Sequence, residues 1–462
     1  MASDAPSRPL GFVLSDYGML LILLLLCAFF SATTTEEQHP TGPAAARQLA
    51  SAIGSGAGRG ARVVIVVRDL DEDAGFADEL RRSLEGRGMT VVETVRGAPA
   101  DARRAITRLA RGGERVDAFA GNQVTAGWAI YPTLIGHHPS LAGAKVYRPE
   151  SYRWPNFLKG ENLLNVANQI AVIAIIAIGM TMVIITGGID LSVGSLIALS
   201  AVVTARLIRD VAGGEAAPVA GMVLSGLGGI LACSASGLFS GLMVTLFRIP
   251  PFIVTLAMML VASGLAYILA DGQSINQVPE RFIWLGRGAD LPYLPNAVLL
   301  MLLLYGLAHV MMGRTVMGRY IYAVGGNSEA ARLSGVPTLR VLRRVYVISG
   351  TLAGLGGVIM ASQLKSGAPT YGQMYELYII AAVVVGGTSL SGGEGKILGT
   401  LIGALIIAVI QNGMNLRGVE SYTQKIVLGL VILGSVLLDR LRHRPGGRGG
   451  TRTASPPGSA RR

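Results

Sequence analysis

Charged residues are scarce in this sequence. They make up 15% of its 462 residues, whereas a soluble globular domain carries about 25%. Hydrophobic residues make up 51%, and the mean hydropathy is +0.51. The 62 glycines agree with this pattern, because close packing between transmembrane helices uses small residues. The composition therefore indicates a protein whose solvent is the lipid bilayer.

Cysteine and histidine are also few. The two cysteines, Cys27 and Cys233, both lie in apolar stretches and are typical of small buried hydrophobic residues, so we expect neither a disulfide nor a thiolate metal site. Five histidines are scattered, and the pair His137–His138 has no other metal ligand near it in sequence. With no catalytic constellation, we expect neither an enzyme nor a metal or cofactor bound by this chain.

A complete nucleotide-binding motif is absent as well. The segments "LSGGE" and "GGEGK" imitate parts of such motifs within residues 386–400. A P-loop needs the sequence G-x-x-x-x-G-K followed by Ser or Thr, which holds Mg²⁺. Ile397 follows Lys396 instead, and no strand with an acidic end follows. We therefore expect a glycine-rich cytoplasmic turn before a packed span, and no nucleotide hydrolysis.

What is present in excess is arginine beside apolar stretches. The net charge is +12, and arginines concentrate in the loop 314–344 and in the tail 441–462. Basic residues flanking transmembrane helices mark the cytoplasmic side. We therefore expect the loop and a disordered tail to be cytoplasmic, and we expect no nucleic-acid binding.

Ten stretches are apolar and long enough to cross a bilayer, which needs about 20 residues. The glycine-rich stretch 217–247 is predicted to be tilted or broken. An even number of spans places both termini in the cytoplasm. Residues 17–31 also fit a cleaved signal peptide, but the segment before them is poorly basic, so we expect an uncleaved anchor. The predicted spans are 12–32, 163–186, 191–209, 217–247, 251–270, 294–313, 341–362, 375–390, 396–413 and 421–438.

The predicted fold is an all-α polytopic membrane protein of about ten transmembrane helices, with a small α/β extracytoplasmic insert between the first two spans. We expect an anchor at 1–32, a linker at 33–60, the insert at 61–150 and the membrane domain at 151–440. The insert alternates strand and helix, which predicts a parallel sheet. Its elements are Val63–Val67, Phe76–Gly86, Val91–Val95, Ala102–Ala110 and Val116–Ala118.

The segment "VDAFAGN", residues 116–122, and the order of these elements resemble half a lobe of a sugar-type periplasmic binding protein. A clamshell binding protein closes two lobes on its ligand, and only part of one is present. Three roles stay open for the insert: docking a separate binding protein, a remnant of a fused one, or a spacer.

Asp190 lies in an apolar run between two predicted spans, where a buried charge is costly and marks either function or a membrane boundary. Gly187, Gly188 and Gly194 permit a broken helix beside a translocation path, and Ser192 can cap a helix start. A tight cytoplasmic turn with Asp190 at the water interface is the alternative.

Side-chain amides elsewhere in the spans suit either sugar hydroxyls or interhelical hydrogen bonds: Asn165, Asn168, Gln169, Gln411, Asn412 and Asn415.

The basic loop also contains a short helix signal. Asn327 is a good N-cap, Ser328–Ser334 is predicted as an amphipathic helix, and Gly335 suits the position after its end. The alternative is an ordinary loop with one helical turn. The segment comprises Gly326, Asn327, Ser328, Glu329, Ala330, Ala331, Arg332, Leu333, Ser334 and Gly335, of which Ala330, Ala331 and Leu333 form the apolar side.

Four segments together carry a family resemblance: "GGIDLSVGS" (187–195), "PPFIVTLAMM" (250–259), "GRYIYAVGGNSEAARLSGV" (318–336) and "VVVGGTSLSGGEGKILGT" (383–400). From about residue 162 to 442 the chain resembles permease subunits of ribose-type monosaccharide importers of the ATP-binding cassette superfamily, which sit in the bacterial inner membrane. The resemblance implies a second permease copy, cytoplasmic ATPase subunits that use ATP and Mg²⁺, and a periplasmic sugar-binding protein. It places the ATPase-coupling helix on Asn327–Gly335.

The insert departs from this family, whose members have a short segment at that place. Two other functions therefore stay open. The chain could be a non-transporting membrane sensor or scaffold that works through the insert. It could also be an ion-coupled secondary transporter, for which Asp190 is the candidate ion site.

Overall fold

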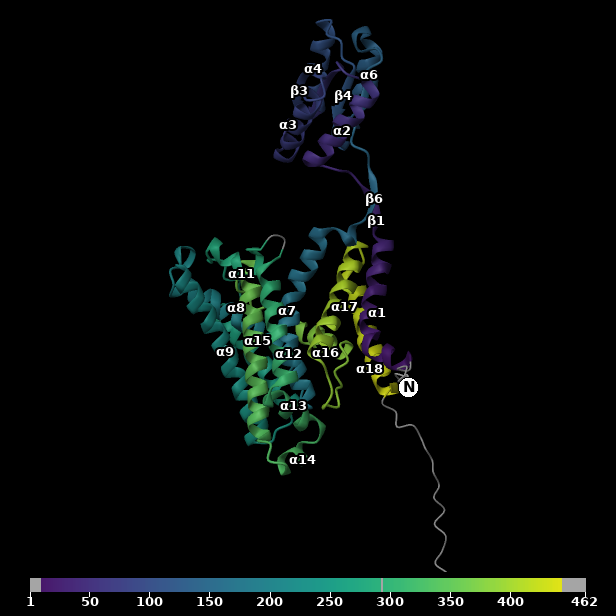
Figure 1. Cartoon of the computed structure of the whole chain (residues 1–462). Coiled ribbons are helices and arrows are strands. Elements are labelled where there is room, and N and C mark those ends of the chain that lie inside the picture. The colour runs from purple at the N-terminus through teal and green to yellow at the C-terminus, as the bar shows by residue number, and fades with distance from the viewer. Residues whose placement is uncertain (1–9, 292–293, 443–462) are drawn as a thin grey trace, which may run out of the picture. The chain divides into compact units, whose positions relative to one another are not determined.

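The computed structural model describes residues 10–291 and 294–442, and the chain divides into two compact units (Figure 1). Unit 1 contains the residues up to Thr34 and those from Asn156 onward, and its regular elements are helices. Unit 2, Thr35–Pro155, is a mixed α/β unit. The predicted tail, apart from its first two residues, lies outside the described residues.

Six of the described helices are long and apolar enough to cross a membrane: α7 (Gly160–Ile185), α9 (Val219–Leu246), α10 (Pro251–Leu269), α12 (Asn296–Arg314), α15 (Thr338–Leu364) and α17 (Ile397–Leu416). This is consistent with a polytopic all-α membrane protein. The remaining helices of unit 1 are α1 (Leu10–Thr33), α8 (Val193–Asp210), α11 (Trp284–Arg287), α13 (Val316–Gly326), α14 (Ser328–Leu333), α16 (Tyr375–Val385) and α18 (Ser421–Arg442). Shorter apolar stretches lie in three of these helices, α1, α16 and α18. The tenth predicted span, 191–209, corresponds to α8.

Two predicted spans need correction. The stretch 375–390 contains only the 11-residue helix α16, which at about 1.5 Å per residue covers roughly half of a bilayer. It ends at Val385 with Gly386 as its C-cap, because the next residue, Gly387, adopts a left-handed φ of +82°, which terminates a helix. The stretch 217–247, predicted to be tilted or broken, is the continuous helix α9, which excludes the broken form but not the tilted one.

The glycines of α9 serve packing. Gly237 and Gly241 lie against the backbone of α15, and Gly350 of α15 lies against the Cys233 carbonyl. A Cβ at Gly237 or Gly350 would overlap the facing helix. Small residues thus let two long helices approach closely. α7 and α15 form the centre of unit 1: α7 is apolar on all sides and almost wholly buried.

Unit 2 contains a four-stranded parallel sheet in the order β3-β2-β4-β5. Strand β2 (Arg62–Val67) is central, and its alternate side chains enter two separate cores, one on each face. A strand buried on both faces reads as a continuous apolar run. The other strands are β3 (Thr90–Arg96), β4 (Ala118–Gly121) and β5 (Lys145–Tyr147), and the ends of the unit, β1 (Thr35–Gln38) and β6 (Tyr152–Pro155), pair antiparallel.

Helices cover both faces of this sheet. α2 (Gly42–Ala57) and α3 (Asp71–Glu85) share one core, and α4 (Pro99–Arg111) and α6 (Ile130–His137) share the other. The predicted linker over 33–60 is thus corrected by α2, since Leu49 and Ile53 are fully buried against β2. The other helix is α5 (Gln123–Ala126).

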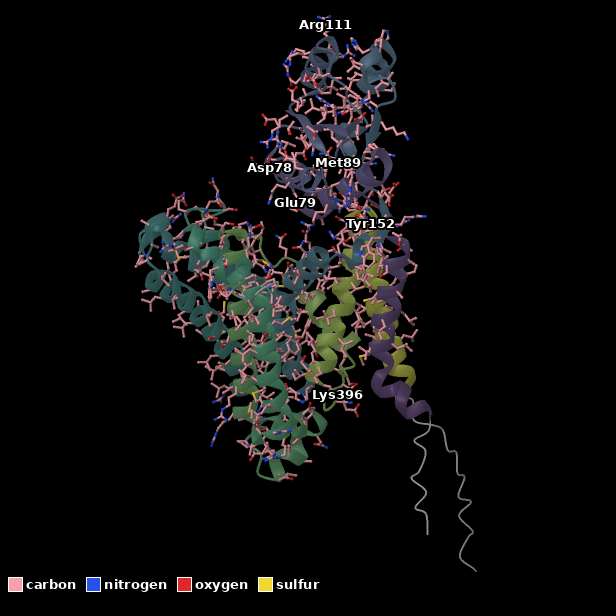
Figure 2. All side chains as sticks on the ribbon, turned by 45° about the horizontal axis from the view of Figure 1, so that its top comes forward. Asp78, Glu79, Met89, Arg111, Tyr152 and Lys396 are labelled. Carbon is pink, nitrogen blue, oxygen red and sulfur yellow. The ribbon has the colours of Figure 1, made fainter. Side chains whose placement is uncertain are left out.

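The predicted third strand also lies slightly further along the chain. It is Ala118–Gly121, and the Asp117 carboxylate just before it accepts a hydrogen bond from the Arg62 backbone N–H at 2.9 Å. Figure 2 shows the dense charged surface of unit 2, with Asp78 and Arg111 exposed, whereas Met89 is buried.

Candidate functional site

The turn between α7 and α8 buries an acid. Asp190 is 2% exposed, and its Oδ1 accepts hydrogen bonds from the Ser192 backbone N–H (3.0 Å) and Oγ (2.6 Å). Its Oδ2 accepts a hydrogen bond from Ser349 Oγ at 2.8 Å, near the middle of α15. Asp190 therefore does not lie at a water interface. Ser192 is the residue before α8, but its hydroxyl bonds to Asp190 and makes no cap hydrogen bond.

The start of α8 meets the start of α16. Gly194 lies so close to the Gly372 carbonyl and to the Glu376 carboxylate that a Cβ would overlap both. Gly372 has a φ of +71°, and Met374, two residues further on, has a φ of +67°. These left-handed residues reverse the chain between α15 and α16. Two short helices therefore begin side by side within unit 1.

A cavity of about 320 Å³ lies at this meeting point. Its polar groups come from α8, α10, and the segment before and within α16. No lysine, arginine or histidine lines it among the described residues. We call this cavity the chamber. Its polar lining residues are Ser195, Ser263, Tyr371, Gln373 and Glu376.

The chamber offers hydrogen bonds of both kinds. Serine and tyrosine hydroxyls and the Gln373 amide donate and accept, and the Glu376 carboxylate accepts only. A neutral polyol needs that mixture, because each of its hydroxyls both donates and accepts. An anion would find no compensating cation in the chamber and would face the Glu376 carboxylate.

The predicted amides lie elsewhere and do not form one lining. Asn412 exchanges hydrogen bonds with Asn162 at 2.8 and 3.0 Å, and Asn415 accepts one from Gln424. Asn168 donates to the Gly286 carbonyl at 3.1 Å. These three amides make interhelical or helix-to-loop bonds.

Three further predicted amides have different surroundings. Gln169 and Gln411 line a small cavity of about 70 Å³ together with Tyr375 and Tyr378. Asn165 is exposed. The predicted site residues thus separate into the buried Asp190–Ser192 pair and a group of amides near the start of α7 and the end of α17.

Two polar residues of this region were missed from the sequence. Glu376 lies at the start of a predicted span, where the rule applied to Asp190 would have identified it as costly. Ser349 carries no such signal, since a lone serine in an apolar helix is ordinary and only the fold brings it to Asp190.

The predicted capped helix is present as α14. Asn327 Oδ1 accepts a hydrogen bond from the Ala330 backbone N–H at 2.9 Å, and Gly335 has a φ of +85° just after the helix. The segment is exposed from Gly326 to Gly335 except at Ala331, which is buried. It protrudes at the end of unit 1 where α13 ends and α15 begins (Figure 1).

The apolar side of α14 differs from the prediction. Ala331 packs inward, whereas Ala330 is exposed and Leu333 is 75% exposed. Arg332 donates to Glu329 at 3.1 Å, and this hydrogen bond lowers the pKa of the Glu329 carboxyl. α14 thus presents one unprotected leucine beside a fixed ion pair, an arrangement suited to a protein partner.

Apolar helices around a polar chamber, with an exposed capped helix at one end, define a polytopic membrane protein of the permease class. The chain belongs to the family described as "Branched-chain amino acid transport system / permease component", whose model matches residues 162–436. The match lies within unit 1 and leaves unit 2 outside it.

Curated relatives carry sugar-transport names, and the resemblance to monosaccharide importer permeases is confirmed. The chain is 46% identical to the ribose import permease protein of Bacillus subtilis over 62% of this chain and 87% of that protein. It is 44% identical to the ribose import permease protein of Escherichia coli strain K12, over 63% and 88%. It is 38% identical to an L-arabinose transporter permease of Azospirillum brasilense, over 63% and 83%. No solved structure matches this chain.

Proposed function

We propose that this chain is the membrane permease subunit of an ATP-driven, binding-protein-dependent importer of a monosaccharide in a bacterial inner membrane. The names of its relatives support the substrate class, since they include ribose and L-arabinose permeases. The chamber supports it independently, because its mixed donors and acceptors suit neutral hydroxyl groups.

In this proposal the sugar passes the chamber between the starts of α8 and α16. Gln373 and Glu376 bind hydroxyls in transit, while the Asp190–Ser192–Ser349 network fixes the start of α8. Two permease subunits, here two copies of this chain, enclose the path. A separate ATPase supplies the energy with ATP and Mg²⁺, and this chain binds neither.

Coupling to that ATPase belongs to α14. The observation that carries the proposal is the capped helix α14 itself, which protrudes from an arginine-rich loop and exposes Leu333 together with Glu329 and Arg332. In this proposal α14 lies in the cytoplasm, and the arginines around it support that side of the membrane. With the proposed spans, both termini are then cytoplasmic and unit 2 is extracytoplasmic, where it meets a sugar-binding protein.

Co-purification in detergent with the cognate ATPase tests this coupling. Leu333→Arg should lower the amount of bound ATPase by at least about tenfold, the loss expected when an anchor residue of an interface is removed. Leu70→Arg in unit 2 is the matched control, because Leu70 is a 49% exposed leucine on the other unit. Ala331 is unsuitable, since it is buried and its replacement would disturb the fold.

If the wild-type chain binds no ATPase, the importer proposal is wrong. A membrane sensor or scaffold that works through unit 2 is then the function to test. If Leu333→Arg and Leu70→Arg both retain wild-type binding, the importer stands but α14 is not the docking helix.

A further inference from the structure

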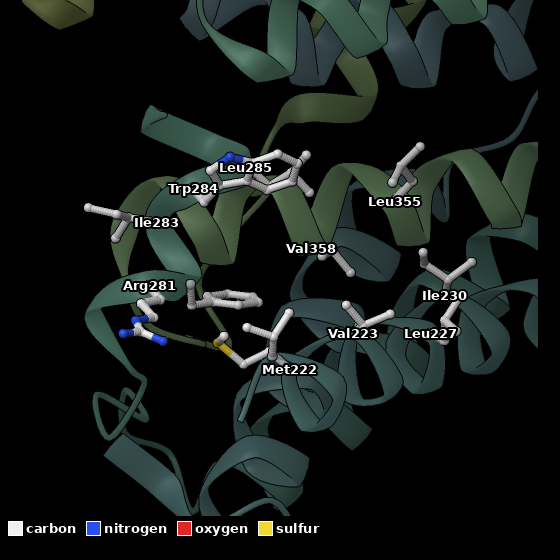
Figure 3. Close-up of a pocket in the computed structure, with 13 residues that line it drawn as sticks. Met222, Val223, Leu227, Ile230, Arg281, Ile283, Trp284, Leu285, Leu355 and Val358 are labelled. Atoms are coloured by element: carbon white, nitrogen blue, oxygen red, sulfur yellow. The ribbon is translucent and has the colours of Figure 1, made fainter. Parts of the chain in front are cut away.

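An apolar groove of about 630 Å³ follows the first half of α9 (Figure 3). Val223, Leu227 and Ile230 of α9 form one wall, and Leu355 and Val358 of α15 form the other. The groove is open toward the outside of unit 1, since Val223 is 56% exposed. Because α9 is long and apolar enough to cross a membrane, this opening faces the bilayer or a membrane partner.

The length of the groove corresponds to one leaflet. Its lining on α9 runs from Val219 to Ile230, a rise of about 16 Å at roughly 1.5 Å per residue. The hydrocarbon core of a bilayer is about 30 Å thick, so one leaflet is about 15 Å deep. A single acyl chain lying along α9 would therefore be covered over its length.

One end of the groove is charged. Arg281 is the single charged residue in its lining and is exposed, and its guanidinium has no hydrogen bond or ion pair within residues 10–291 and 294–442. Trp284 lies in the same segment, and its indole N–H donates to the Asp290 carboxylate at 3.0 Å. Tryptophan and arginine at one end of an apolar surface are typical of the level of lipid headgroups.

We propose that this groove binds an anionic phospholipid of the bilayer, with an acyl chain against α9 and α15 and the phosphate on Arg281. A cation at the headgroup level favours an anionic lipid. A protein partner would instead need the unpaired Arg281 to find a carboxylate within an otherwise apolar interface.

Such a lipid would lie against the segment that contains Arg281 and Trp284, and this segment contacts the centre of unit 1. Gly286 accepts a hydrogen bond from Asn168 of α7, and its backbone N–H donates to Ser362 Oγ of α15 at 2.8 Å. Ser362 Oγ in turn donates to the Phe282 carbonyl at 2.5 Å. Lipid bound beside Arg281 and Trp284 therefore connects bilayer composition to the packing of α7 and α15.

Fluorescence quenching by brominated lipids tests the proposal in full-length protein in bilayers. Trp128→Phe and Trp154→Phe leave Trp284 as the single tryptophan. Each brominated lipid is mixed with unlabelled phosphatidylcholine, and the quenching of Trp284 gives its relative affinity for the groove. Brominated phosphatidylglycerol should bind about fivefold more tightly than brominated phosphatidylcholine, the factor expected for one arginine at an anionic surface. Arg281→Gln should remove this preference, whereas Arg287→Gln, which alters an arginine outside the groove, should keep it.

A second pair of variants tests the groove itself. Val223→Phe fills it and should reduce quenching by both lipids, while Leu224→Phe, on the adjacent exposed position outside the lining, should not. Equal quenching by the two lipids in the wild-type chain would overturn the proposal and leave an ordinary lipid annulus. Protection of Trp284 from both lipids would also overturn it, in favour of a second copy of the chain covering the groove.

Discussion

Glu376 is the carboxylate that distinguishes the chamber from its apolar surroundings. It is half-buried at the start of α16, and a Cβ at Gly194 would overlap it. The absence of a side chain at Gly194 thus leaves space for the Glu376 carboxylate at the chamber. In the proposed function it accepts hydrogen bonds from sugar hydroxyls, and it makes the chamber unfavourable for anions.

Glu376→Gln keeps the shape of this side chain but removes its charge. Hydrogen bonds to a charged group contribute about 1.5–3 kcal/mol and those to a neutral group about 1 kcal/mol, so we expect sugar uptake to fall by roughly tenfold. ATPase binding should stay unchanged, because α14 is untouched. Uptake of labelled sugar by cells measures the first and co-purification the second. Wild-type uptake in the variant would exclude Glu376 from the path.

Asp73 and Asp117 make the stability of unit 2 depend on pH. Burial alone would raise the pKa of Asp73, but hydrogen bonds from the Arg68 side chain and backbone outweigh it and hold the pKa below its usual range. The pKa of Asp117 is lowered chiefly by the Arg62 backbone N–H. Because both folded pKa values lie below the unfolded value of about 3.9, the stabilisation is present above that pH and is lost as the pH falls through the folded values.

Urea unfolding of a single-tryptophan chain that retains Trp128 reports on unit 2, because Trp128 packs against its core. The urea concentration at the midpoint of unfolding should be lower at pH 3 than at pH 5. At pH 7, Asp73→Asn should lower the free energy of unfolding by about 1.5–3 kcal/mol, since it removes charge-assisted hydrogen bonds. Asp69→Asn, at an exposed position nearby, should change it by less than about 0.5 kcal/mol. Equal effects of the two variants would contradict this account.

At the residue scale, sequence identified Asp190 and the cap of α14 because each follows a local rule. An acid in an apolar run is costly, and an asparagine before a short helix is a cap. The partners of Asp190 could not be predicted, since Ser349 is far away along the chain and ordinary in its local context. The role of the amides stayed open in the sequence, because their residue type does not reveal whether they face a path or another helix.

Among the elements, α9 and α15 form a closely packed helix pair. Gly350 lies against the Cys233 carbonyl, and Gly237 lies against the Tyr346 carbonyl. Helices at this separation depend on the absence of side chains at their contact. The sequence showed the glycines but left a tilted or a broken helix open, because glycine frequency alone does not distinguish a break from a packing surface.

Gly350→Ala should therefore destabilise unit 1. The added Cβ has no space, so the helices must separate, at a cost of about 1–3 kcal/mol. Gly264→Ala on α10 is the control, because a Cβ there meets open space and alanine favours a helix by up to about 1 kcal/mol. Thermal unfolding in detergent should show a lower midpoint for the first variant and an equal or higher one for the second. If the Gly350→Ala variant unfolds at the same temperature as the Gly264→Ala variant or at a higher one, α9 and α15 do not pack as closely as described.

Two other elements show the limit of composition. α16 was predicted as part of a full span because the glycine-rich turn after it continues into further apolar sequence. α2 was taken as a linker because alanine, glycine and serine dominate its sequence, although Leu49 and Ile53 bury it in unit 2. Hydropathy measures how apolar a stretch is, and it does not locate the ends of a helix within it.

On the scale of the whole molecule, the two units have separate cores, and the family match concerns only unit 1. The family match covers residues 162–436 in unit 1, so the role of unit 2 does not follow from the family. The sequence predicted an α/β segment with a parallel sheet before the main membrane domain, and the strands of the sheet in unit 2 pair parallel. The function of unit 1 can therefore be tested with unit 2 in place.

Uptake of labelled ribose into proteoliposomes that contain this chain, its cognate ATPase and its sugar-binding protein tests the central claim most directly. The account predicts uptake that requires ATP and Mg²⁺ and is lost in Leu333→Arg. L-arabinose and D-allose should be tried in the same way, because permeases for both sugars are among the relatives. ATPase bound to the wild-type chain without ATP-dependent uptake of any of these sugars would contradict a monosaccharide importer.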